Sequence, residues 1–383
     1  MLLKTLKKWK WLHTWSSLVC TVFLLMLCVT GIPLIFYQEI HEWSGNEVKA
    51  PDLPDSAGFA SMDAILASAK ALHPDLVVQF VFRDSDEDKS WTVSLGKTPT
   101  SEDDVKQVLV DSRTAQVLAQ PKFDEGFMYV MFKLHVDCFA GLPGMLFLGF
   151  MGLLFVIAII SGVVLYAPFM RRLDFGTIRK ETTVKLKRLD THNFIGITAL
   201  FWMLVVGVTG IINAWSDLVI NYWQFDQMPA ITAHYQGLPM PTTLASLQAS
   251  VQAAQAEEPD MRLGFIAFPG TRFSSPHHYG MFMRGDNPLT SRLFRPVLID
   301  AQTAKLTDSL EIPWYLTTLL ISQPLHFGDY GGLPLKIIWL VFDLMTITVL
   351  WTGLMLWWKK RADKPTVMEA NPEHKNILCR NNP

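Results

Sequence analysis

The stretch FMYVMFKLHVDCFAGLPGMLFLGFMGLLFVIAIISGVVLYAP, residues 127–168, contains the main features that recur along the chain. Its second part, 144–168, is a continuous apolar run that is long enough to cross a bilayer as a helix, which takes about 20 residues. Its first part, 127–140, is also apolar, contains His135 and is followed by Gly-Leu-Pro, a helix-breaking sequence. We therefore predict a membrane span that is preceded by a short helix at one membrane face.

Three other apolar runs have a similar length, which predicts four spans in all. They lie at residues 12–38, 193–215 and 335–358, and a second short helix at 313–327 precedes the last of them. Half of the 383 residues are hydrophobic and 18% are charged, whereas soluble domains carry about a quarter charged residues. This composition excludes intrinsic disorder, and 33 basic residues against 35 acidic ones argue against nucleic-acid binding.

The distribution of basic residues predicts the orientation of the spans. Seventeen Lys and Arg residues lie in three segments, 1–12, 167–191 and 359–383. The two long connections, 41–127 and 216–312, hold 14 Lys and Arg against 25 Asp and Glu. Because basic residues collect on the cytoplasmic side, we expect a multi-pass membrane protein with both termini in the cytoplasm. The first apolar run is too long for a cleaved signal peptide, which predicts an uncleaved signal anchor.

Short matches in the same order along the chain indicate an internal duplication. Val29-Thr30-Gly31 recurs as Val208-Thr209-Gly210, and Leu134-His135 recurs as Leu325-His326. The other matches are His13 with His192, Gly141-Leu142-Pro143 with Gly332-Leu333-Pro334, Ser161-Gly162 with Thr352-Gly353, and Asp111-Ser-Arg-Thr-Ala with Asp300-Ala-Gln-Thr-Ala. One unit is therefore a span, an outer domain, a short helix and a second span, and the chain contains two such units.

Each long connection has the pattern of an α+β domain. In the first, residues 60–73 have helical periodicity, and strands are predicted at 77–83, 90–95 and 105–111. The second repeats this order with a helix at 243–256 and strands at 263–268, 279–284 and 296–300. The expected fold is an internally duplicated α-helical membrane protein with four transmembrane helices, two short outer-face helices and two α+β domains on the outer side.

The predicted boundaries follow from these segments. They are 1–40 for the cytoplasmic tail and first span, 41–127 for the first outer domain, 128–168 for the outer-face helix and second span, 169–191 for the basic cytoplasmic loop, 192–215 for the third span, 216–312 for the second outer domain, 313–358 for the outer-face helix and fourth span, and 359–383 for the cytoplasmic tail.

Four of the ten histidines occupy equivalent places in the two units. His13 and His192 lie at the cytoplasmic ends of the first and third spans, and His135 and His326 lie at the outer ends of the second and fourth. Two neutral imidazoles at one depth on different helices suit bis-axial ligation of a haem iron. The sequence therefore predicts two haem sites, one near each face of the membrane.

Other cofactors fit the sequence less well. Zinc takes four nitrogen or sulfur ligands, or three and a water, whereas each layer offers two histidines. The chain has no Cys-x-x-Cys-His sequence for covalent attachment, so the expected haems are b-type. It also has no Gly-x-Gly-x-x-Gly after a strand and no P-loop, so no nicotinamide, flavin or ATP site is predicted. The alternative for the four histidines is a structural role as polar residues at the membrane interface.

The His-bearing Gly-Leu-Pro corners, the histidines at the starts of the odd spans and the Asp-x-x-Thr-Ala segments resemble the PepSY-associated transmembrane family over roughly residues 5–360. Within that family the chain is most similar to ferric-siderophore reductases of the FoxB type. The resemblance implies PepSY-like periplasmic domains and a location in the bacterial inner membrane. It also implies two b haems that pass electrons across that membrane to ferric siderophore in the periplasm. It implies that His13 and His192 hold the cytoplasmic-side haem and that His135 and His326 hold the periplasmic-side one. The expected electron donor is quinol or a cytoplasmic reductase.

Six other residues are weaker candidates for chemistry. Asp343 lies inside the fourth span, where a carboxylate is costly, and is expected either to handle protons or quinol or to hydrogen-bond to Asn213 or a hydroxyl. His41, at the outer end of the first span, is an alternative haem ligand. A Ser/Pro-rich loop that would meet a substrate, or would simply be solvated, contains or adjoins His277, His278, Arg272 and Arg284.

Four basic residues lie close in sequence to the paired histidines and are candidates for pairing with haem propionates. They are Lys10, Arg188, Lys133 and Lys336. Two other functions remain compatible with the sequence as a whole. One is a non-redox regulator of peptidases, and the other is a siderophore or metal transporter that uses Asp343 and the Gly-Leu-Pro breaks as a pathway.

Overall fold

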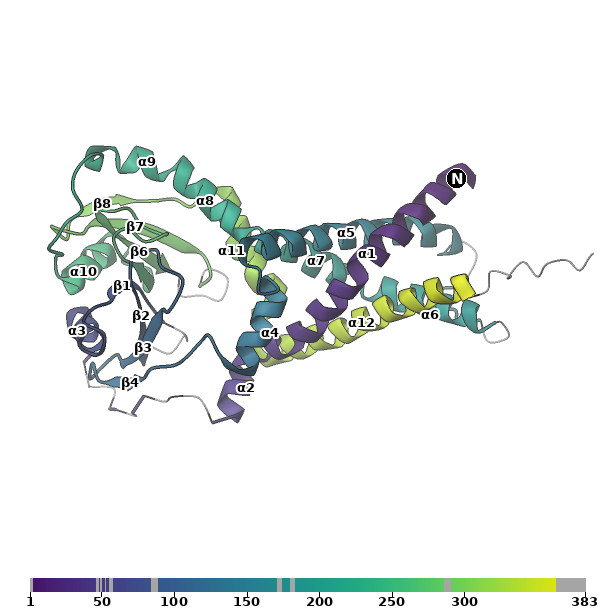
Figure 1. Cartoon of the computed structure of the whole chain (residues 1–383), viewed down its shortest axis with the longest axis horizontal. Helices are drawn as coiled ribbons and strands as arrows, with labels where there is room; N and C mark the ends of the chain where they lie inside the picture. Colours follow the sequence, from purple (N-terminus) through teal and green to yellow (C-terminus); the bar gives the residue numbers. More distant parts are fainter. Residues whose placement is uncertain are drawn as a thin grey trace, which may run out of the picture.

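A computed structural model of the chain describes residues 3–362 except 46–47, 49, 52, 55–57, 84–88, 171–173, 180–182 and 286–290. The molecule is elongated, with a bundle of long helices at one end and an eight-stranded sheet at the other (Figure 1). Three helices are long and apolar enough to cross a membrane, namely α1 (Leu3–Ile35), α5 (Gly141–Met170) and α12 (Gly332–Ala362). Helix α1 begins and α12 ends at the end of the bundle that is away from the sheet (Figure 1).

The expected third span is formed by two helices rather than one. Helices α6 (Val184–Thr198) and α7 (Leu200–Ala214) meet at Ala199 with a bend of 66°, as in a broken span or a re-entrant loop. The residues of α6 include Lys185, Lys187 and Arg188, whereas α7 is apolar, so the two helices suit different depths in a membrane. The structure therefore contains three or four candidate spans, and the apolar pattern of 193–215 did not reveal the bend.

The two segments that were predicted to form separate α+β domains share one continuous antiparallel sheet. Its strand order is β4-β3-β2-β1-β5-β6-β7-β8, so that β1 and β5 join the two halves at the centre. The strands are β1 (Val77–Phe82), β2 (Ser90–Gly96), β3 (Lys106–Asp111), β4 (Val117–Ala119), β5 (Arg262–Ala267), β6 (His278–Arg284), β7 (Phe294–Asp300) and β8 (Leu306–Ser309). All six predicted strands are present within about two residues. The short edge strands β4 and β8 and the joining of the halves were not predicted.

The repeated Asp-x-x-Thr-Ala segments form the turns that lead into the two edge strands. Asp111 Oδ1 accepts a hydrogen bond from the backbone N–H of Thr114 at 2.7 Å, and Ala115 follows with a φ of 57°. The second half repeats this turn with Asp300, Thr303 and Ala304. An aspartate that binds backbone N–H groups two and three residues later stabilises a tight turn, which explains why the motif occurs once in each half.

Helices cover both faces of the sheet. On one face, α3 (Met62–Leu72) and α10 (Leu247–Glu257) pack over the main hydrophobic core. Their first turns are linked, because the Met62 N–H donates to Gln248 Oε1 at 2.8 Å and the Leu247 N–H donates to Asp63 Oδ1 at 2.6 Å. The other face packs against the segments α8 (Ser216–Asp226), α9 (Met228–Ile231) and α11 (Trp314–Phe327). Between α9 and α10 lies the short 3-10 helix η1 (Ala233–Tyr235).

The two predicted short helices before the second and fourth spans are present and lie between the sheet and the long helices (Figure 1). They are α4 (Gly126–Val136) and α11, and each precedes a long helix that starts at the glycine of Gly-Leu-Pro. A further short helix, α2 (Tyr37–Trp43), continues α1 on the sheet side. The Lys336 ammonium, 7% exposed, binds the Glu39 carboxylate at 2.7 Å and so fixes α12 to α2 at this level.

We predict that the seam between β1 and β5 contributes strongly to stability. Ile266 is fully buried opposite Val81 in this seam. Ile266→Ala is expected to lower the free energy of unfolding by about 2–5 kcal/mol, because buried methyl groups are lost and a cavity remains. The control is Leu72→Ala at the exposed end of α3, for which a change within about 0.5 kcal/mol is expected. Thermal unfolding of the purified protein, followed by tryptophan fluorescence, compares the two, and equal shifts would contradict the prediction.

Candidate functional site

The four duplicated histidines form two pairs in the structure. His13 of α1 faces His192 of α6 with ring centroids 6.5 Å apart, and His135 of α4 faces His326 of α11 at 6.2 Å. Thr30 lies on α1, 17 residues after His13, and its hydroxyl contacts His135 of the other pair. At 1.5 Å per residue, the two pairs are therefore about 25 Å apart along α1. The pair on α4 and α11 lies on the sheet side of the bundle, and the other pair lies towards the opposite end.

One ring nitrogen of each histidine is held by a neighbouring helix. Three Nδ1 atoms lie 2.9–3.1 Å from a carbonyl oxygen, in the pairs His13 with Ala158, His192 with Val349, and His326 with Val206. The Nδ1 atom of His135 binds the Thr30 hydroxyl at 3.0 Å and the Leu27 backbone. Because a carbonyl oxygen can only accept, Nδ1 carries the proton and donates it. The unprotonated nitrogen is then Nε2, which is the form that binds a metal.

A Ser-Gly or Thr-Gly sequence on the neighbouring helix surrounds each imidazole. The hydroxyl lies 3.0–3.3 Å from Nδ1, in the pairs His13 with Ser161, His192 with Thr352, His135 with Thr30, and His326 with Thr209. The following glycine is in close contact with the ring, since an added Cβ would lie 3.0–3.4 Å from the imidazole Cε1 atom. These glycines are Gly162, Gly353, Gly31 and Gly210. The sequence revealed these residues as marks of duplication, but it did not reveal that they position the histidines.

The spacing within each pair fits a metal shared by two imidazoles. With metal–nitrogen bonds of roughly 2 Å and a ring atom about 1 Å from its centroid, two opposed imidazoles place their centroids about 6 Å apart. Within the described part of the chain, no group of three or more His, Cys, Asp or Glu side chains is arranged to hold a metal ion. A macrocycle that supplies the remaining ligands of the metal, as haem does, therefore suits these pairs better than zinc does.

The four basic residues near the pairs differ in their surroundings. Arg188, one helical turn before His192, is the best candidate for a propionate, because its buried Nη1 has no hydrogen-bond partner among the residues that the structure describes. Lys336 binds Glu39, and Lys133 forms an ion pair with Asp137, the residue that follows the end of α4. Lys10 is exposed on α1.

The buried carboxylate Asp343 has a different neighbour from the one expected. It lies in α12, ten residues before Gly353, is 5% exposed, and contacts the Cys28 thiol of α1. Its Oδ2 atom has no hydrogen-bond partner among the described residues. The expected bond to Asn213 is not formed, since Asn213 Nδ2, the donor that a carboxylate would need, has no hydrogen-bond partner among the described residues. A role for Asp343 in proton or quinol handling stays a prediction.

The outer candidates do not form one cluster. His278 is fully buried at the start of β6, where its Nδ1 lies 2.5 Å from the Ser275 hydroxyl and its Nε2 lies 3.0 Å from the Thr307 hydroxyl. Arg284 lies six residues further along β6, which is about 20 Å at 3.3 Å per residue. The expected grouping of these two residues in one loop site is therefore wrong.

Three more candidates are placed in local contacts. The His277 ring stacks on Tyr235 with centroids 5.4 Å apart. Arg272 forms an ion pair with Asp217 of α8 at 2.8 Å, which ties the loop after β5 to that helix. The His41 ring lies against Tyr37 of the same helix, α2, with ring centroids 4.5 Å apart. His135 is paired with His326, so His41, the alternative haem ligand, is not part of that pair.

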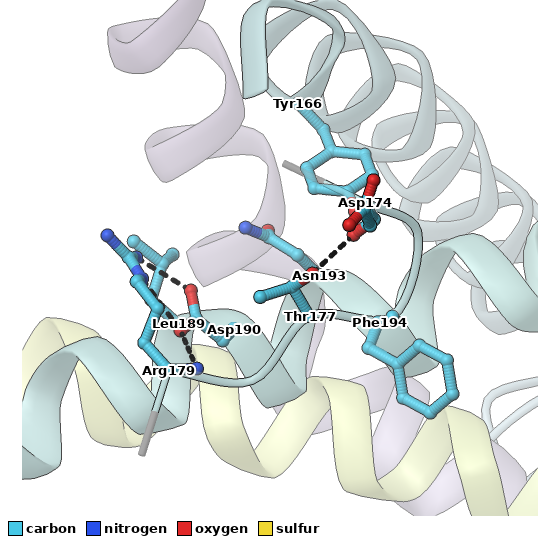
Figure 2. Close-up of a pocket in the computed structure, with 9 residues that line it drawn as sticks. Tyr166, Asp174, Thr177, Arg179, Leu189, Asp190, Asn193 and Phe194 are labelled. Carbon is cyan, nitrogen blue, oxygen red and sulfur yellow. Dashed lines mark hydrogen bonds and ion pairs between the residues drawn. The ribbon is translucent and has the colours of Figure 1, made fainter. Parts of the chain in front are cut away.

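A small hollow lies beside the His13–His192 end, between the loop after α5 and helix α6. Figure 2 shows the Arg179 guanidinium bound to both oxygens of Asp190, at 2.7 and 3.0 Å, next to Asn193. The hollow measures about 20 Å³, which is enough for one water molecule and not for a quinol. The ion pair therefore holds the loop against α6, close to His192, and does not line a cofactor site.

Comparisons with known proteins agree with this architecture. A family model described as the PepSY-associated TM region matches residues 10–360, which include both histidine pairs and their glycines. An uncharacterised protein of Pseudomonas aeruginosa, PA4219, is 26% identical over 258 residues. That match covers 62% of this chain and 64% of the other protein, so it spans less than two thirds of the relative's length.

We predict that the buried His278 makes the outer sheet sensitive to acid. Desolvation lowers the pKa of His278 from 6.5 to about 4. As the pH falls below about 6.5, His278 takes up a proton in the unfolded chain but not in the folded sheet. The free energy of unfolding is therefore highest above pH 6.5 and decreases as the pH falls towards 4, by at most about 1.4 kcal/mol per pH unit. His278→Gln is expected to flatten the dependence of Tm on pH in this window. The control is His234→Gln at an exposed position, which should leave the dependence of Tm on pH unchanged. Equal slopes of Tm against pH for the wild type and His278→Gln would contradict the prediction.

Proposed function

Because the chain belongs to the PepSY-associated transmembrane family, we propose that it is a di-haem b electron-transfer protein that reduces ferric siderophore outside the bacterial inner membrane, as a reductase of the FoxB type. The observation that carries this proposal is the pair of matched histidine sites, with ring centroids 6.5 and 6.2 Å apart, at two levels of the helix bundle. His13 and His192 would hold one haem, and His135 and His326 the other. When bound, the two haems would supply one-electron redox chemistry at both membrane faces.

The proposed orientation places the sheet in the periplasm. The start of α1, with Lys4, Lys7 and Lys8, and helix α6, with Lys185, Lys187 and Arg188, lie at the end of the bundle that is away from the sheet (Figure 1), as the positive-inside rule requires for the cytoplasmic side. The outer connections are acidic overall. In this orientation the His135–His326 pair is next to the periplasmic sheet, and the His13–His192 pair is next to the cytoplasm.

The protein's own residues would control the sites in two ways. The hydrogen bonds from Nδ1 to backbone carbonyls fix the tautomer and the direction of each Nε2, and they raise the basicity of the ligand. Apolar and aromatic side chains fill the space between the two levels. Trp339 donates to the carbonyl of His326 at 3.2 Å, and Trp202 of α7 stacks on Phe342 of α12 with centroids 6.0 Å apart. Such packing keeps the path between the two levels dry.

The reaction needs no acid–base residues on the outer side. One electron converts Fe(III) of the chelate to Fe(II), which hard oxygen donors hold less tightly, so that iron leaves its ligand. The electron would come from quinol or from a cytoplasmic reductase. A regulator of peptidases or a siderophore transporter would not need two histidine pairs whose ring centroids are 6.5 and 6.2 Å apart, as expected for two ligands of one metal. This spacing therefore favours the redox function over both alternatives.

We predict that the purified protein contains two b haems. A reduced-minus-oxidised spectrum should show split α and β bands, and pyridine haemochrome quantification should give about two haems per chain. His13→Ala and His326→Ala should each lose about one haem, because each removes one ligand of a different pair. Protein expressed with ample haem that is folded but colourless would contradict the proposal, and unchanged haem content in both variants would contradict the ligand assignment.

We also predict that Gly210 is required for the outer site alone. A side chain at Gly210 would meet the His326 ring, since an added Cβ lies 3.0 Å from Cε1. Gly210→Val is therefore expected to displace this imidazole and to lose about one haem, while the His13–His192 site keeps its own. The control is Gly58→Val, which lies far in sequence from all four histidines, because a Cβ added at Gly58 meets none of the described atoms within 4 Å. Equal haem loss in both variants would show a general folding defect instead.

A further inference from the structure

Asp343 is a carboxylate inside a long apolar helix, and neither histidine pair uses it as a ligand. The residue is 5% exposed, and its Oδ2 atom has no hydrogen-bond partner in the part of the chain that the structure describes. Helix α12 runs from Gly332 to Ala362, so Asp343 lies about 16 Å along the axis from the outer end and about 28 Å from the other end. A carboxylate at such a depth in a membrane is costly and marks a functional position.

Asp343 lies at the depth of the outer histidine pair. Its carboxylate contacts the Cys28 thiol of α1. Leu27, next to Cys28, binds His135 through its backbone, and Thr30 binds the same ring through its hydroxyl at 3.0 Å. These three residues of α1 span about 4.5 Å along the helix axis. The carboxylate is therefore within about one helical turn, in depth, of the contacts that hold this pair.

The charged groups around Asp343 are few. Helix α12 packs against α1, α6 and α7, of which α1 presents the Cys28 thiol and α7 contains no titratable residue. The charged residues of α6 lie near His192, which contacts α12 six residues beyond Asp343, and the two histidines of the outer pair lie at its own depth. On α12, Lys336 is seven residues nearer the outer end and is paired with Glu39. Among the described residues, no Lys or Arg is paired with the Asp343 carboxylate.

The internal duplication indicates that packing alone does not account for this carboxylate. Counted from the matched glycines beside the histidines, Asp343 corresponds to Gly152 and Cys28 corresponds to Gly207. These two glycines pack closely, since a Cβ added at Gly152 would lie 3.9 Å from the Gly207 carbonyl oxygen. The equivalent helix contact is therefore made by two glycines in one half of the bundle and by a carboxylate and a thiol in the other.

Resting on the proposed function, we propose that Asp343 holds the proton that balances the electron at the outer histidine pair. When bound there, a b haem supplies one-electron chemistry, and its iron–porphyrin core has one positive charge when oxidised and none when reduced. An ionised Asp343 balances that charge in the oxidised state. After reduction the carboxylate is an unbalanced charge in the membrane, so Oδ2 takes a proton from water on the nearer, outer side and forms an O–H bond. When the electron passes to the ferric chelate, this O–H bond breaks and the proton returns to water.

Redox titration of the purified full-length protein at several pH values tests this inference. Because each electron brings a proton, the midpoint potential of the outer haem should fall as the pH rises, by up to about 59 mV per pH unit, which is a tenfold change in a one-electron equilibrium. Asp343→Asn has a similar shape but cannot ionise. It should remove most of this slope and give a higher potential than the wild type at alkaline pH. The outer haem is identified by its loss in His326→Ala.

Two neighbouring substitutions serve as controls, and both should keep the slope of the wild type. Thr346→Val, one turn further along α12, removes a buried hydroxyl that binds the Phe342 carbonyl. Cys28→Ala removes the thiol and keeps the carboxylate. A slope that survives in Asp343→Asn would overturn the inference, as would a slope that is lost in Cys28→Ala and not in Asp343→Asn.

A second measurement uses the wild type, so it holds even if Asp343→Asn does not fold. The reduced-minus-oxidised infrared spectrum should gain the C=O band of a protonated carboxyl group, and this band should shift in D2O. Two haems per chain with neither the band nor the slope would overturn this inference and leave the reductase intact. Two haems with the band and the slope, in a protein that does not reduce ferric chelates, would support the proton site and contradict the reductase.

Discussion

The hydrogen bond from an imidazole Nδ1 to a carbonyl on a neighbouring helix is the contact on which the arrangement of the pairs depends. Each bond crosses from one helix to another, in the pairs α1 to α5, α6 to α12, α4 to α1, and α11 to α7. In a membrane an unpaired imidazole N–H is costly, so the bond both joins the helices and determines which nitrogen is available. The glycine beside each ring allows the approach, because any larger residue would separate the helices.

Two ion pairs tie together segments near the junction of the sheet and the long helices. Lys336 and Glu39 join the starts of α12 and α2, and Arg272 and Asp217 join the sheet to α8. The His135–His326 pair likewise joins two segments that are far apart in sequence and belong to different units.

Much of this arrangement could be predicted from the sequence, because the signals are local and repeated. Apolar length predicted α1, α5 and α12, alternation predicted the six longer strands, and duplication identified the four histidines that are now found in pairs. The bend at Ala199 was missed, because an apolar pattern does not record the direction of a helix. The role of Thr209 and Gly210 beside His326 was missed because that contact joins residues more than 100 positions apart. The contact between Phe80 and Phe273 was also missed, because these residues are far apart in sequence and meet only when the two halves of the sheet join.

The seam between β1 and β5 shows that the two units are related by a pseudo-twofold axis. Val81 lies opposite Ile266, its own counterpart in the second unit, and the linked first turns of α3 and α10 exchange equivalent bonds. Every histidine pair takes one member from each unit, so neither unit contains a complete site. The architecture is thus that of a homodimer fused into one chain, with both pairs lying across its axis. The two units are not identical, because α1 of the first unit is one long helix whereas its counterpart in the second is bent by 66° between α6 and α7.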